Sequence, residues 1–402
     1  MTAVTVRGTV ATTTVTPQDQ GDAARVMRET AAANQTVAFV GGGTELGFGY
    51  APTRVDVSID TTRLDRIVEY QPADMVVEVE CGVTLAALQA HLAPHGQRLA
   101  LDAPQPEHAT LGGLVATNAF GPRRARFGSM RDLIVGVSFL RADGARVRGG
   151  GKVVKNVAGF DLPKLAVGSL GSLGMIATVT LRLHPLPEVT LGVAAAVPTA
   201  GDVAAVVRAC FAKQLEPAAV VAVREARGYT VTALFEGFAS GAREQVDRFA
   251  SLVRELGFEA GERDAVASEV AALDDDVRTH GDVRVRIAVP PADLERADRD
   301  AIAPLVVVLT DARAIVYPSL GIAFVSGTGN EKVAVVDALL AARRAVEARG
   351  GNLVVTHADD ALVAERVDVY GTLPPSFALM RGLKERFDPA ARLNPGRFLG
   401  KL

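Results

Sequence analysis

The sequence has few residues of the kinds that form disulfide bridges or bind metals. Cys81 and Cys210 are the only cysteines among 402 residues, too few for a disulfide framework or for an iron–sulfur cluster within the chain. His91 and His95 lie four residues apart, but a proline and a glycine beside them indicate the end of a helix, so we expect no metal site there. The cysteine count fits a reducing compartment.

Strong charge and long apolar runs are also missing. No stretch of about 18 apolar residues is free of charge, so the sequence predicts no membrane-spanning segment. The N-terminal segment MTAVTVRGTVATTTVTPQDQ has no apolar core of the kind that a signal peptide needs. A formal net charge of −3 gives no electrostatic reason to expect nucleic acid or an anionic membrane as a partner. We expect a cytoplasmic globular protein, either free or attached to a membrane through a partner.

The pattern of predicted strands and helices divides the chain into three parts. The composition, 49% hydrophobic and 22% charged, is that of an ordinary globular protein. Residues 1–187 alternate predicted strands and helices and then become rich in glycine and β-forming residues, which indicates a small parallel sheet followed by a mixed sheet. Residues 188–375 predict antiparallel strands backed by helices, and residues 376–402 begin as a helix and end in a tail punctuated by proline and glycine. The fold class is therefore α+β.

The predicted elements follow from the apolar periodicity and from the turn residues between apolar segments. The predicted strands cover residues 36–40, 55–59, 75–80, 191–197, 220–224, 230–236, 283–289, 314–318 and 322–325, and the first three are expected in the parallel sheet. The predicted helices cover residues 19–33, 85–92, 203–213, 243–256 and 331–349. The acidic residues 274–276 predict a solvated turn.

Three consecutive glycines follow the first predicted strand, in the stretch TVAFVGGGTEL from Thr36 to Leu46. Such a run needs a backbone purpose, either a tight turn or a close approach of N–H groups to an anion. The dinucleotide-binding fingerprint is excluded, because Leu46 stands where its third glycine is needed. A phosphate loop is excluded as well, because neither Gly-Lys pair of the chain is followed by serine or threonine.

Three further stretches belong with this glycine run. They are APQPEHATLGGLVATNAFGPRRARFGSMRD at residues 103–132, GGGKVVKNVAGFDLPKLAVGSLGSLGMIATVTLRLHPLP at residues 149–187, and RFDPAARLNPGRF at residues 386–398. Together the four resemble the flavin-binding half of the vanillyl-alcohol oxidase and p-cresol methylhydroxylase (PCMH) superfamily. More closely, they resemble the FAD-binding subunit of bacterial glycolate oxidase. The resemblance covers residues 16–187 and the last twenty or so residues.

The resemblance implies a fold and a cofactor. The fold would be a two-lobed PCMH-type FAD-binding domain over residues 1–187, an α+β cap domain with an antiparallel sheet over 188–375, and a C-terminal segment, 376–402, that returns to the FAD domain. The pyrophosphate of FAD carries two negative charges, and backbone N–H groups can bind it without a basic patch where Cβ atoms are missing. Because the glycine run ends in Thr44-Glu45, with no histidine or cysteine to form a covalent bond, we expect noncovalent FAD.

The residues expected to contact FAD lie in all four stretches. They are Val40, Gly41, Gly42, Gly43, Thr44 and Leu46 in the first; Pro104, Thr110, Leu111, Gly112, Gly113, Thr117, Asn118, Gly121, Arg126, Phe127 and Gly128 in the second; Gly168, Gly171, Gly174 and Ile176 in the third; and Asn394 in the last. Two groups have a plain alternative. Arg126 to Gly128 could be part of a solvated basic loop, and Asn394 begins an Asn-Pro-Gly sequence typical of turns.

The resemblance also implies an activity, the oxidation of glycolate or a related 2-hydroxy acid to the 2-oxo acid. An arginine would bind the substrate carboxylate by a two-pronged contact, and Arg224, Arg284 and Arg286 are candidates among which the sequence does not choose. No catalytic base is assigned. The expected partners are a second FAD subunit and an iron–sulfur subunit that accepts the electrons.

Two other functions stay open at this point. One is a stand-alone flavin oxidase or dehydrogenase that acts on another alcohol. The other is a flavin-bearing subunit that relays electrons or supports assembly without a catalytic site of its own. A third and more remote option is a nucleotide-binding protein without redox chemistry.

Overall fold

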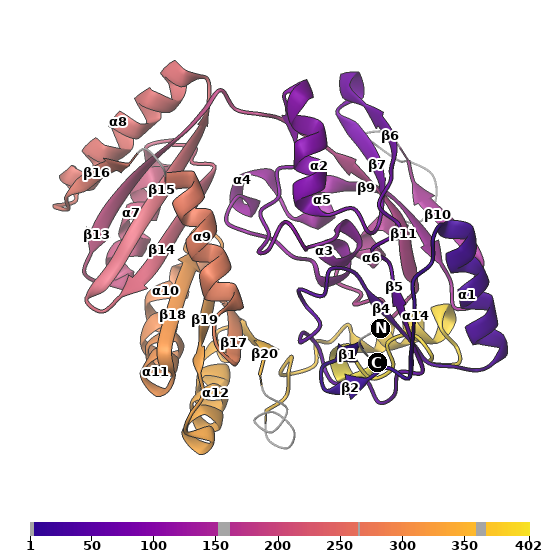
Figure 1. The fold of residues 1–402 in the computed structure, drawn as a ribbon. Coiled ribbons are helices and arrows are strands. Elements are labelled where there is room, and N and C mark those ends of the chain that lie inside the picture. The colour runs from indigo at the N-terminus through magenta and orange to yellow at the C-terminus, as the bar shows by residue number, and fades with distance from the viewer. Residues whose placement is uncertain (1–3, 152–160, 264–265, 359–366) are drawn as a thin grey trace. The chain divides into compact units, whose positions relative to one another are not determined.

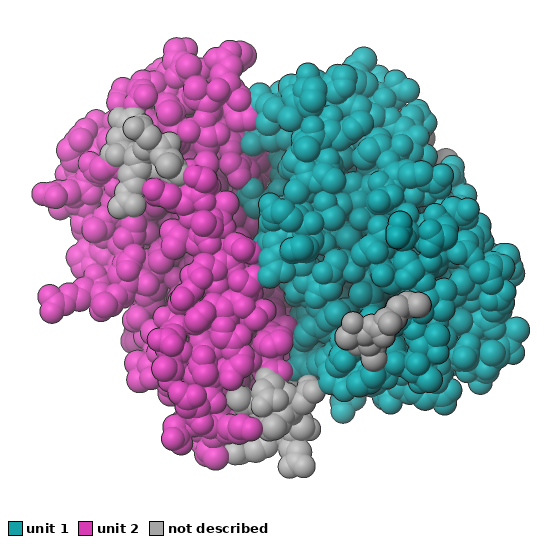
Figure 2. All heavy atoms as spheres, in the orientation of Figure 1, with its two compact units in different colours: residues 1–120, 128–186, 373–402 teal, residues 121–127, 187–372 magenta. Residues whose placement is uncertain are grey.

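The computed structural model describes residues 4–151, 161–263, 266–358 and 367–402 (Figure 1). The chain forms two compact units, which Figure 2 colours separately. Unit 1 contains Met1–Phe120, Gly128–Leu186 and Leu373–Leu402, and unit 2 contains Gly121–Phe127 and Pro187–Thr372. Among the described residues, no helix is both long and apolar enough to cross a membrane.

A three-stranded parallel sheet in unit 1 carries the glycine run. Its strands are β3 (Thr13–Val15), β5 (Val57–Asp60) and β4 (Val37–Val40), in that order. Val37 and Val40 of β4 are β-branched, which favours a strand, and both are buried. Strand β4 is at the edge of the sheet and ends where the glycines begin. The small parallel sheet that the sequence predicts is confirmed for β4 and β5, and β3 is a strand that the sequence analysis did not predict.

The second sheet of unit 1 is antiparallel. Its order is β10 (Arg146–Gly150), β9 (Ile134–Leu140), β11 (Met175–Arg182), β7 (Val76–Glu80) and β6 (Ile67–Gln71). The prediction that residues 75–80 join the parallel sheet is wrong. Only the short helix η1 (Pro72–Asp74) and Met75 separate β6 from β7. Such a short connection makes neighbouring strands antiparallel, because parallel strands need a crossover of a dozen or more residues.

One hydrophobic core joins the two sheets of unit 1 to the helices beside them. It includes Met27, Ile59, Leu88, Leu111 and Val179, each fully buried. The remaining elements of unit 1 are β1 (Thr5–Val6), β2 (Thr9–Val10), α1 (Gln20–Ala32), α2 (Leu85–Leu92), η2 (Ala93–His95), β8 (Gln97–Arg98), α3 (Leu111–Thr117), α5 (Met130–Leu133), α6 (Leu162–Ala166), β12 (His184–Pro185), α14 (Phe377–Phe387) and η5 (Leu399–Lys401).

Unit 2 is built on one eight-stranded antiparallel sheet. Its strand order is β16 (Ala260–Arg263), β13 (Val189–Val197), β15 (Gly228–Gly237), β14 (Ala219–Glu225), β18 (Thr310–Tyr317), β19 (Ile322–Thr328), β17 (Val283–Ala288) and β20 (Asn352–His357). Its helices are α4 (Arg124–Phe127), α7 (Ala200–Ala212), α8 (Ala239–Glu255), α9 (Val266–Thr279), η3 (Pro291–Asp293), α10 (Leu294–Ala297), η4 (Asp298–Ile302), α11 (Ala303–Val308) and α12 (Lys332–Glu347). The predicted α+β class is confirmed.

The two faces of this sheet differ in chemistry. Val283, Val285 and Ile287 of β17 belong to the core beneath the helices that include α7 and α12. Because side chains alternate along a strand, Arg284 and Arg286 lie on the opposite face. Helix α9 packs against β13, β15, β18 and β19 (Figure 1).

The prediction of a solvated turn at residues 274–276 is wrong, because these residues belong to helix α9. Asp274 is only 4% exposed. Its carboxylate accepts a hydrogen bond from Tyr317 Oη, and Arg278 Nη1 lies 3.2 Å from its Oδ2. When consecutive residues lie on a helix, only some of their side chains point toward the rest of the protein. Three acidic residues in a row therefore do not reveal from the sequence which of them is buried.

The carboxylate of Asp56 fixes the start of β4. Asp56 Oδ2 accepts hydrogen bonds from Thr36 N at 2.7 Å and from Thr36 Oγ1 at 2.9 Å, and Arg54 Nε donates to Oδ1 at 2.6 Å. The hydrogen bond from Arg54, together with those from Thr36, lowers the pKa of Asp56 from 3.8 to about 2. A lowered pKa stabilises the folded protein above the unfolded value of 3.8, and this stabilisation is lost as the pH falls toward 2.

We therefore expect Asp56→Asn to have a lower free energy of unfolding than the wild type at pH 5, and the difference to shrink as the pH falls toward 2. Urea unfolding of both proteins at several pH values measures this difference. A difference that stays constant over the whole range would contradict the assigned role of Asp56.

Candidate cofactor site

The glycine loop after β4 packs against a second segment of unit 1. A Cβ atom added to Gly42 would lie 1.6 Å from the carbonyl oxygen of His108, and one added to Gly41 would lie 2.1 Å from Thr110 Oγ1. Gly43 has a φ of +79°, which favours glycine. The first two glycines are thus needed for packing within the protein, whatever ligand the loop also meets.

The backbone N–H groups of the same loop could donate hydrogen bonds to a ligand. In the described part of the chain, the N–H groups of Gly41, Gly42, Gly43 and Thr44 donate no hydrogen bond to another protein group. Gly42 and Gly43 are also exposed. Consecutive N–H groups of this kind can bind an anion.

Helix α3 follows the segment that meets the glycine loop. Thr110 caps it, with its hydroxyl accepting a hydrogen bond from Gly113 N at 3.3 Å. A Cβ atom on Gly112 would lie 2.7 Å from Cys81 Cβ, so this glycine lets the helix pack closely. Thr117 Oγ1 donates to Gly113 O at 2.8 Å within the helix. Asn118 ends it with a φ of +53°, as asparagine often does at this position.

The third stretch returns to this helix. Gly168 N donates to Val115 O, and Leu170 N donates to Ala116 O, each at 2.9 Å. Gly168 and Gly171 have φ values of +76° and +70°. A Cβ atom on Gly171 would lie 2.6 Å from Asn394 Nδ2, so this glycine makes room for the C-terminal tail.

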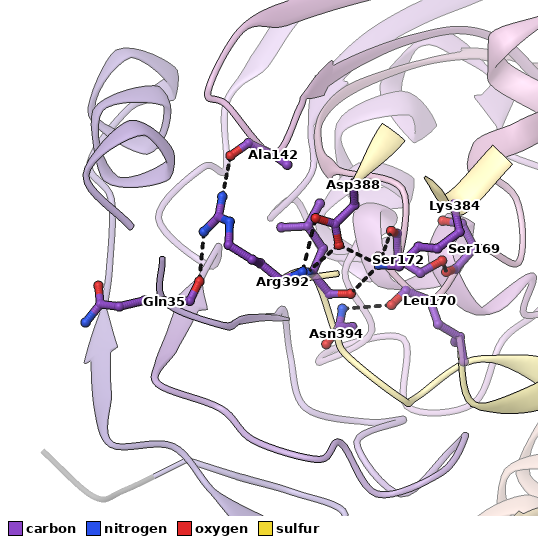
Figure 3. Close-up of polar contacts among 10 residues, drawn as sticks. Gln35, Ala142, Ser169, Leu170, Ser172, Lys384, Asp388, Arg392 and Asn394 are labelled. Atoms are coloured by element: carbon purple, nitrogen blue, oxygen red, sulfur yellow. Dashed lines mark hydrogen bonds and ion pairs between the residues drawn. The ribbon is translucent and has the colours of Figure 1, made fainter. Parts of the chain in front are cut away.

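The C-terminal tail docks beside the glycine loop. Leu393 pairs in parallel with Val37 of β4, and Asn394 N donates to Val37 O at 2.7 Å. The Asn394 side chain donates from Nδ2 to Leu170 O at 2.8 Å (Figure 3). Arg397 Nη2 donates to the carbonyl oxygens of Glu45 and Leu46, each at 3.1 Å. The tail therefore contacts both the first and the third stretch.

Three buried polar atoms near these loops have no hydrogen-bond partner among the residues that the structure describes: Asn118 Oδ1, Ser169 Oγ and Asn394 Oδ1. Ser169 belongs to the segment 168–171 itself. Asn118 Cβ would lie 3.6 Å from a Cβ atom on Gly168, and Asn394 Nδ2 donates a hydrogen bond to Leu170 O, so the other two residues lie beside the same segment. Buried polar groups are normally paired, and leaving one unpaired costs about 1–3 kcal/mol. A ligand with hydrogen-bonding groups would satisfy them, so the residues present fit a polar cofactor. Ser169 is not among the contacts expected from the sequence, although its place between glycines in GSLGSLG is a signal.

The other expected contacts are placed as follows. Pro104 lies in the loop before α3, and Leu111 and Ile176 are buried in α3 and β11. Gly174 precedes β11, where a Cβ atom would lie 2.8 Å from Leu140 O. Gly128, with a φ of +84°, precedes α5 in unit 1.

Three expected contacts belong to unit 2, namely Gly121, Arg126 and Phe127. Arg126 Nη1 donates to Glu216 O at 2.7 Å, and Arg126 Nη2 lies 3.2 Å from Glu216 Oε2. A role for these three residues in cofactor binding stays a prediction.

Neither the histidines nor the cysteines form an obvious reactive centre. The rings of His91 and His95 contact Tyr70, with centroids 5.5 and 5.2 Å apart. Within the described residues, no three or more His, Cys, Asp and Glu side chains form a group that could hold a metal ion. Burial raises the pKa of Cys81 and of Cys210 to about 12, so neither is a thiolate at neutral pH.

Comparison with known proteins identifies the cofactor. Residues 11–150, which include the glycine loop and α3, match the family model described as FAD binding domain. The chain is 40% identical over 126 residues to "Glycolate oxidase subunit GlcE" of Escherichia coli, covering 31% of this chain and 36% of that one. The match thus spans about a third of that relative's length. Over 90% of this chain and 82% of the other, it is 27% identical to "D-lactate dehydrogenase" of Anaerostipes hadrus.

Solved structures agree on the fold. An alkyldihydroxyacetonephosphate synthase structure superposes with a TM-score of 0.74 at 18% identity, covering 96% of this chain and 77% of that one. Residues 11–150 therefore form an FAD-binding domain, and FAD is the cofactor. The chain is a homologue of proteins named glycolate oxidase subunits, over about a third of its length, which confirms the resemblance to that family.

Proposed function

We propose that this chain is an FAD-dependent oxidoreductase that converts glycolate or a related 2-hydroxy acid to the 2-oxo acid. The observation that carries the proposal is the set of unpaired donors and acceptors around the glycine loop and residues 168–171, inside the unit that matches the FAD binding domain. The relatives' names support the substrate class, since glycolate and D-lactate are both small 2-hydroxy acids.

The chain's own residues would bind and orient the cofactor. The N–H groups of Gly41 to Thr44 supply donors for the pyrophosphate. The side chains of Asn118, Ser169 and Asn394 supply partners for other polar groups of the cofactor. Bound FAD supplies an acceptor for the hydride equivalent that leaves the hydroxyl-bearing carbon of the substrate.

The three arginines that could bind a carboxylate lie on two faces of the unit 2 sheet. Arg224 shares its face of β14 with the core residue Ala222, and its Nε lies 3.3 Å from Asp298 Oδ1. Arg284 donates from Nε and Nη2 to the carbonyl oxygens of residues 280 and 281. Arg286 lies on the same sheet face as Arg284, opposite Phe324 of β19. We infer that this face of β17 binds the substrate carboxylate, with Arg286 as the first residue to test against Arg284.

The electrons need an acceptor outside this chain. Two buried cysteines do not provide the four thiolates of an iron–sulfur cluster. We propose that the chain works beside a second FAD subunit and an iron–sulfur subunit. The names of two relatives support a complex of some kind, because each is called a subunit of glycolate oxidase. The cytoplasmic location, free or at a membrane through such a partner, is proposed with it.

The purified protein should carry noncovalent FAD that a 2-hydroxy acid reduces. Acid or heat precipitation should leave the flavin in the supernatant, and mass spectrometry should identify it as FAD. Anaerobic glycolate or D-lactate should then bleach the visible flavin band of the native protein, whereas ethanol should not.

Flavin that stays in the pellet would contradict the noncovalent assignment, and released FMN would remove the pyrophosphate argument. Bleaching only after partner subunits are added would favour a relay role. Rapid production of hydrogen peroxide by the isolated chain would favour a stand-alone oxidase.

A further inference from the structure

Helix α14 contains a buried lysine with three acceptors around its ammonium group. Lys384 is 6% exposed. Its Nζ donates to Asp388 Oδ2 at 2.6 Å, to Ser172 O at 2.9 Å and to Leu393 O at 2.9 Å (Figure 3). An ammonium group has three N–H donors, so these contacts use all of them.

Asp388 completes the connection. It is 1% exposed, and its Oδ1 accepts a hydrogen bond from Arg392 N at 3.1 Å while its Oδ2 accepts one from Leu393 N at 2.7 Å. The carboxylate therefore fixes the backbone immediately before Asn394. Arg392 extends the attachment, because its guanidinium donates to Gln35 O at 2.7 Å and to Ala142 O at 2.6 Å (Figure 3).

The two backbone segments that Lys384 joins carry two of the unpaired polar atoms. Asn394 follows Leu393 directly, and Ser169 lies in the same short loop as Ser172, whose Oγ donates to Ser169 O at 2.7 Å. The Asn394 amide is oriented by its donation from Nδ2 to Leu170 O, which leaves Oδ1 as the atom without a partner. Lys384 thus fixes the distance between Ser169 and Asn394 without contacting either side chain in the described structure.

We propose that Lys384 is a positioning residue of the flavin site, which acts with Asp388 to hold Asn394 Oδ1 and Ser169 Oγ where FAD meets them. The inference rests on the proposed function, because it assumes that these two atoms contact FAD. A buried ion pair is seldom more stabilising than apolar side chains of similar size. The contribution of the Lys384–Asp388 pair is therefore positional, because its directional hydrogen bonds join the C-terminal tail to the loop 168–172.

A double-mutant cycle on FAD affinity tests the inference. In the wild-type background, Lys384→Met should raise the FAD dissociation constant about 10- to 100-fold, because the supporting contacts of Asn394 are lost. Asn394→Ala should have a similar effect. If Lys384 acts through Asn394, adding Lys384→Met to Asn394→Ala should change the constant less than about threefold. Both single variants should also alter the shape of the bound flavin's visible band in the same way.

A matched control makes the same chemical change at an exposed ion pair. Lys213 Nζ lies 3.2 Å from Glu255 Oε2, and the two side chains are 58% and 61% exposed. Lys213→Met should leave the FAD dissociation constant unchanged. If Lys384→Met does not fold, Asp388→Asn replaces it in the cycle, since it keeps the side-chain shape and removes the charge that holds Lys384.

The outcomes separate this inference from the proposed function. A wild-type chain that binds no FAD would overturn both. A wild-type chain that binds FAD while the Lys384 or Asp388 variant binds it equally well would overturn only the positioning role. An equal loss of affinity with and without Asn394 would also overturn it, because such additivity indicates a general structural effect.

Discussion

Replacing Gly42 by alanine should abolish FAD binding and lower the free energy of unfolding of the apoprotein by about 3 kcal/mol. The added Cβ would lie 1.6 Å from His108 O and 2.6 Å from His108 C, so one of the two backbone segments must move. A backbone carbonyl cannot rotate away as a flexible side chain can. The movement would also displace the N–H groups of the glycine loop from the cofactor.

One glycine of unit 2 serves as a control for this variant, and Gly113 tests a cofactor contact expected from the sequence. Gly241 lies in helix α8 of unit 2, and a Cβ atom there would meet nothing within 4 Å, so Gly241→Ala should leave stability and FAD content intact or slightly improved. Gly113→Ala places its Cβ 3.2 Å from Thr110 Oγ1, a contact that a small shift relieves. A loss of FAD by Gly113→Ala at unchanged stability would mean that the cofactor approaches this glycine closely.

Urea unfolding of the apoproteins and fluorescence titration with FAD measure the two effects. A Gly42→Ala protein with wild-type stability and full FAD affinity would show that the loop does not have the packing described here. Stability lost without any change in FAD affinity would separate the packing role of Gly42 from cofactor binding.

At Gly42 the sequence predicts only part of the local structure. A run of three glycines predicts a close backbone approach, but the sequence does not say which group approaches. From the sequence we expected a ligand, whereas the structure places residues 108–110 against Gly41 and Gly42. Contacts between segments more than sixty residues apart depend on the whole fold and leave no local pattern.

Regular elements were easier to predict than the contacts between them. Strand 37–40 and helix 85–92 follow from local apolar patterns and turn residues. Helix α9 was missed because its acidic triplet resembles a solvated turn, although Asp274 is buried against Tyr317. Charge alone does not reveal whether a residue of an amphipathic helix has a partner across the core.

The tail shows the same limit in the site itself. The Asn-Pro-Gly sequence at Asn394 is typical of a turn, and the resemblance added an expected approach to the flavin. Neither indicated that Lys384 and Asp388 fix the tail, because a lysine and an aspartate at i and i+4 usually form an exposed pair on a helix. Their burial arises from loop 168–172, more than two hundred residues earlier in the chain.

Replacing Arg286 by methionine should lower kcat/KM for a 2-hydroxy acid by about 100- to 1000-fold, because the substrate carboxylate would lose its charged, two-pronged partner. Arg286→Lys should recover only part of the loss, since an ammonium group keeps the charge but not the planar pair of donors. The FAD dissociation constant should be unchanged in both variants. Arg286 lies on the face of β17 opposite to Val283, Val285 and Ile287, so neither change removes a side chain from the core that these three residues form.

A comparison of substrates isolates the carboxylate contact. The amide of the same 2-hydroxy acid has the reacting carbon and hydroxyl but no negative charge, so its slower turnover should be nearly equal in the wild type and Arg286→Met. Arg284→Met is the matched variant, two residues away on the same strand and face. If it loses activity toward the acid while Arg286→Met does not, Arg284 is the carboxylate-binding residue and our assignment is wrong. If neither variant distinguishes the acid from its amide, the sheet face of β17 does not bind the substrate carboxylate.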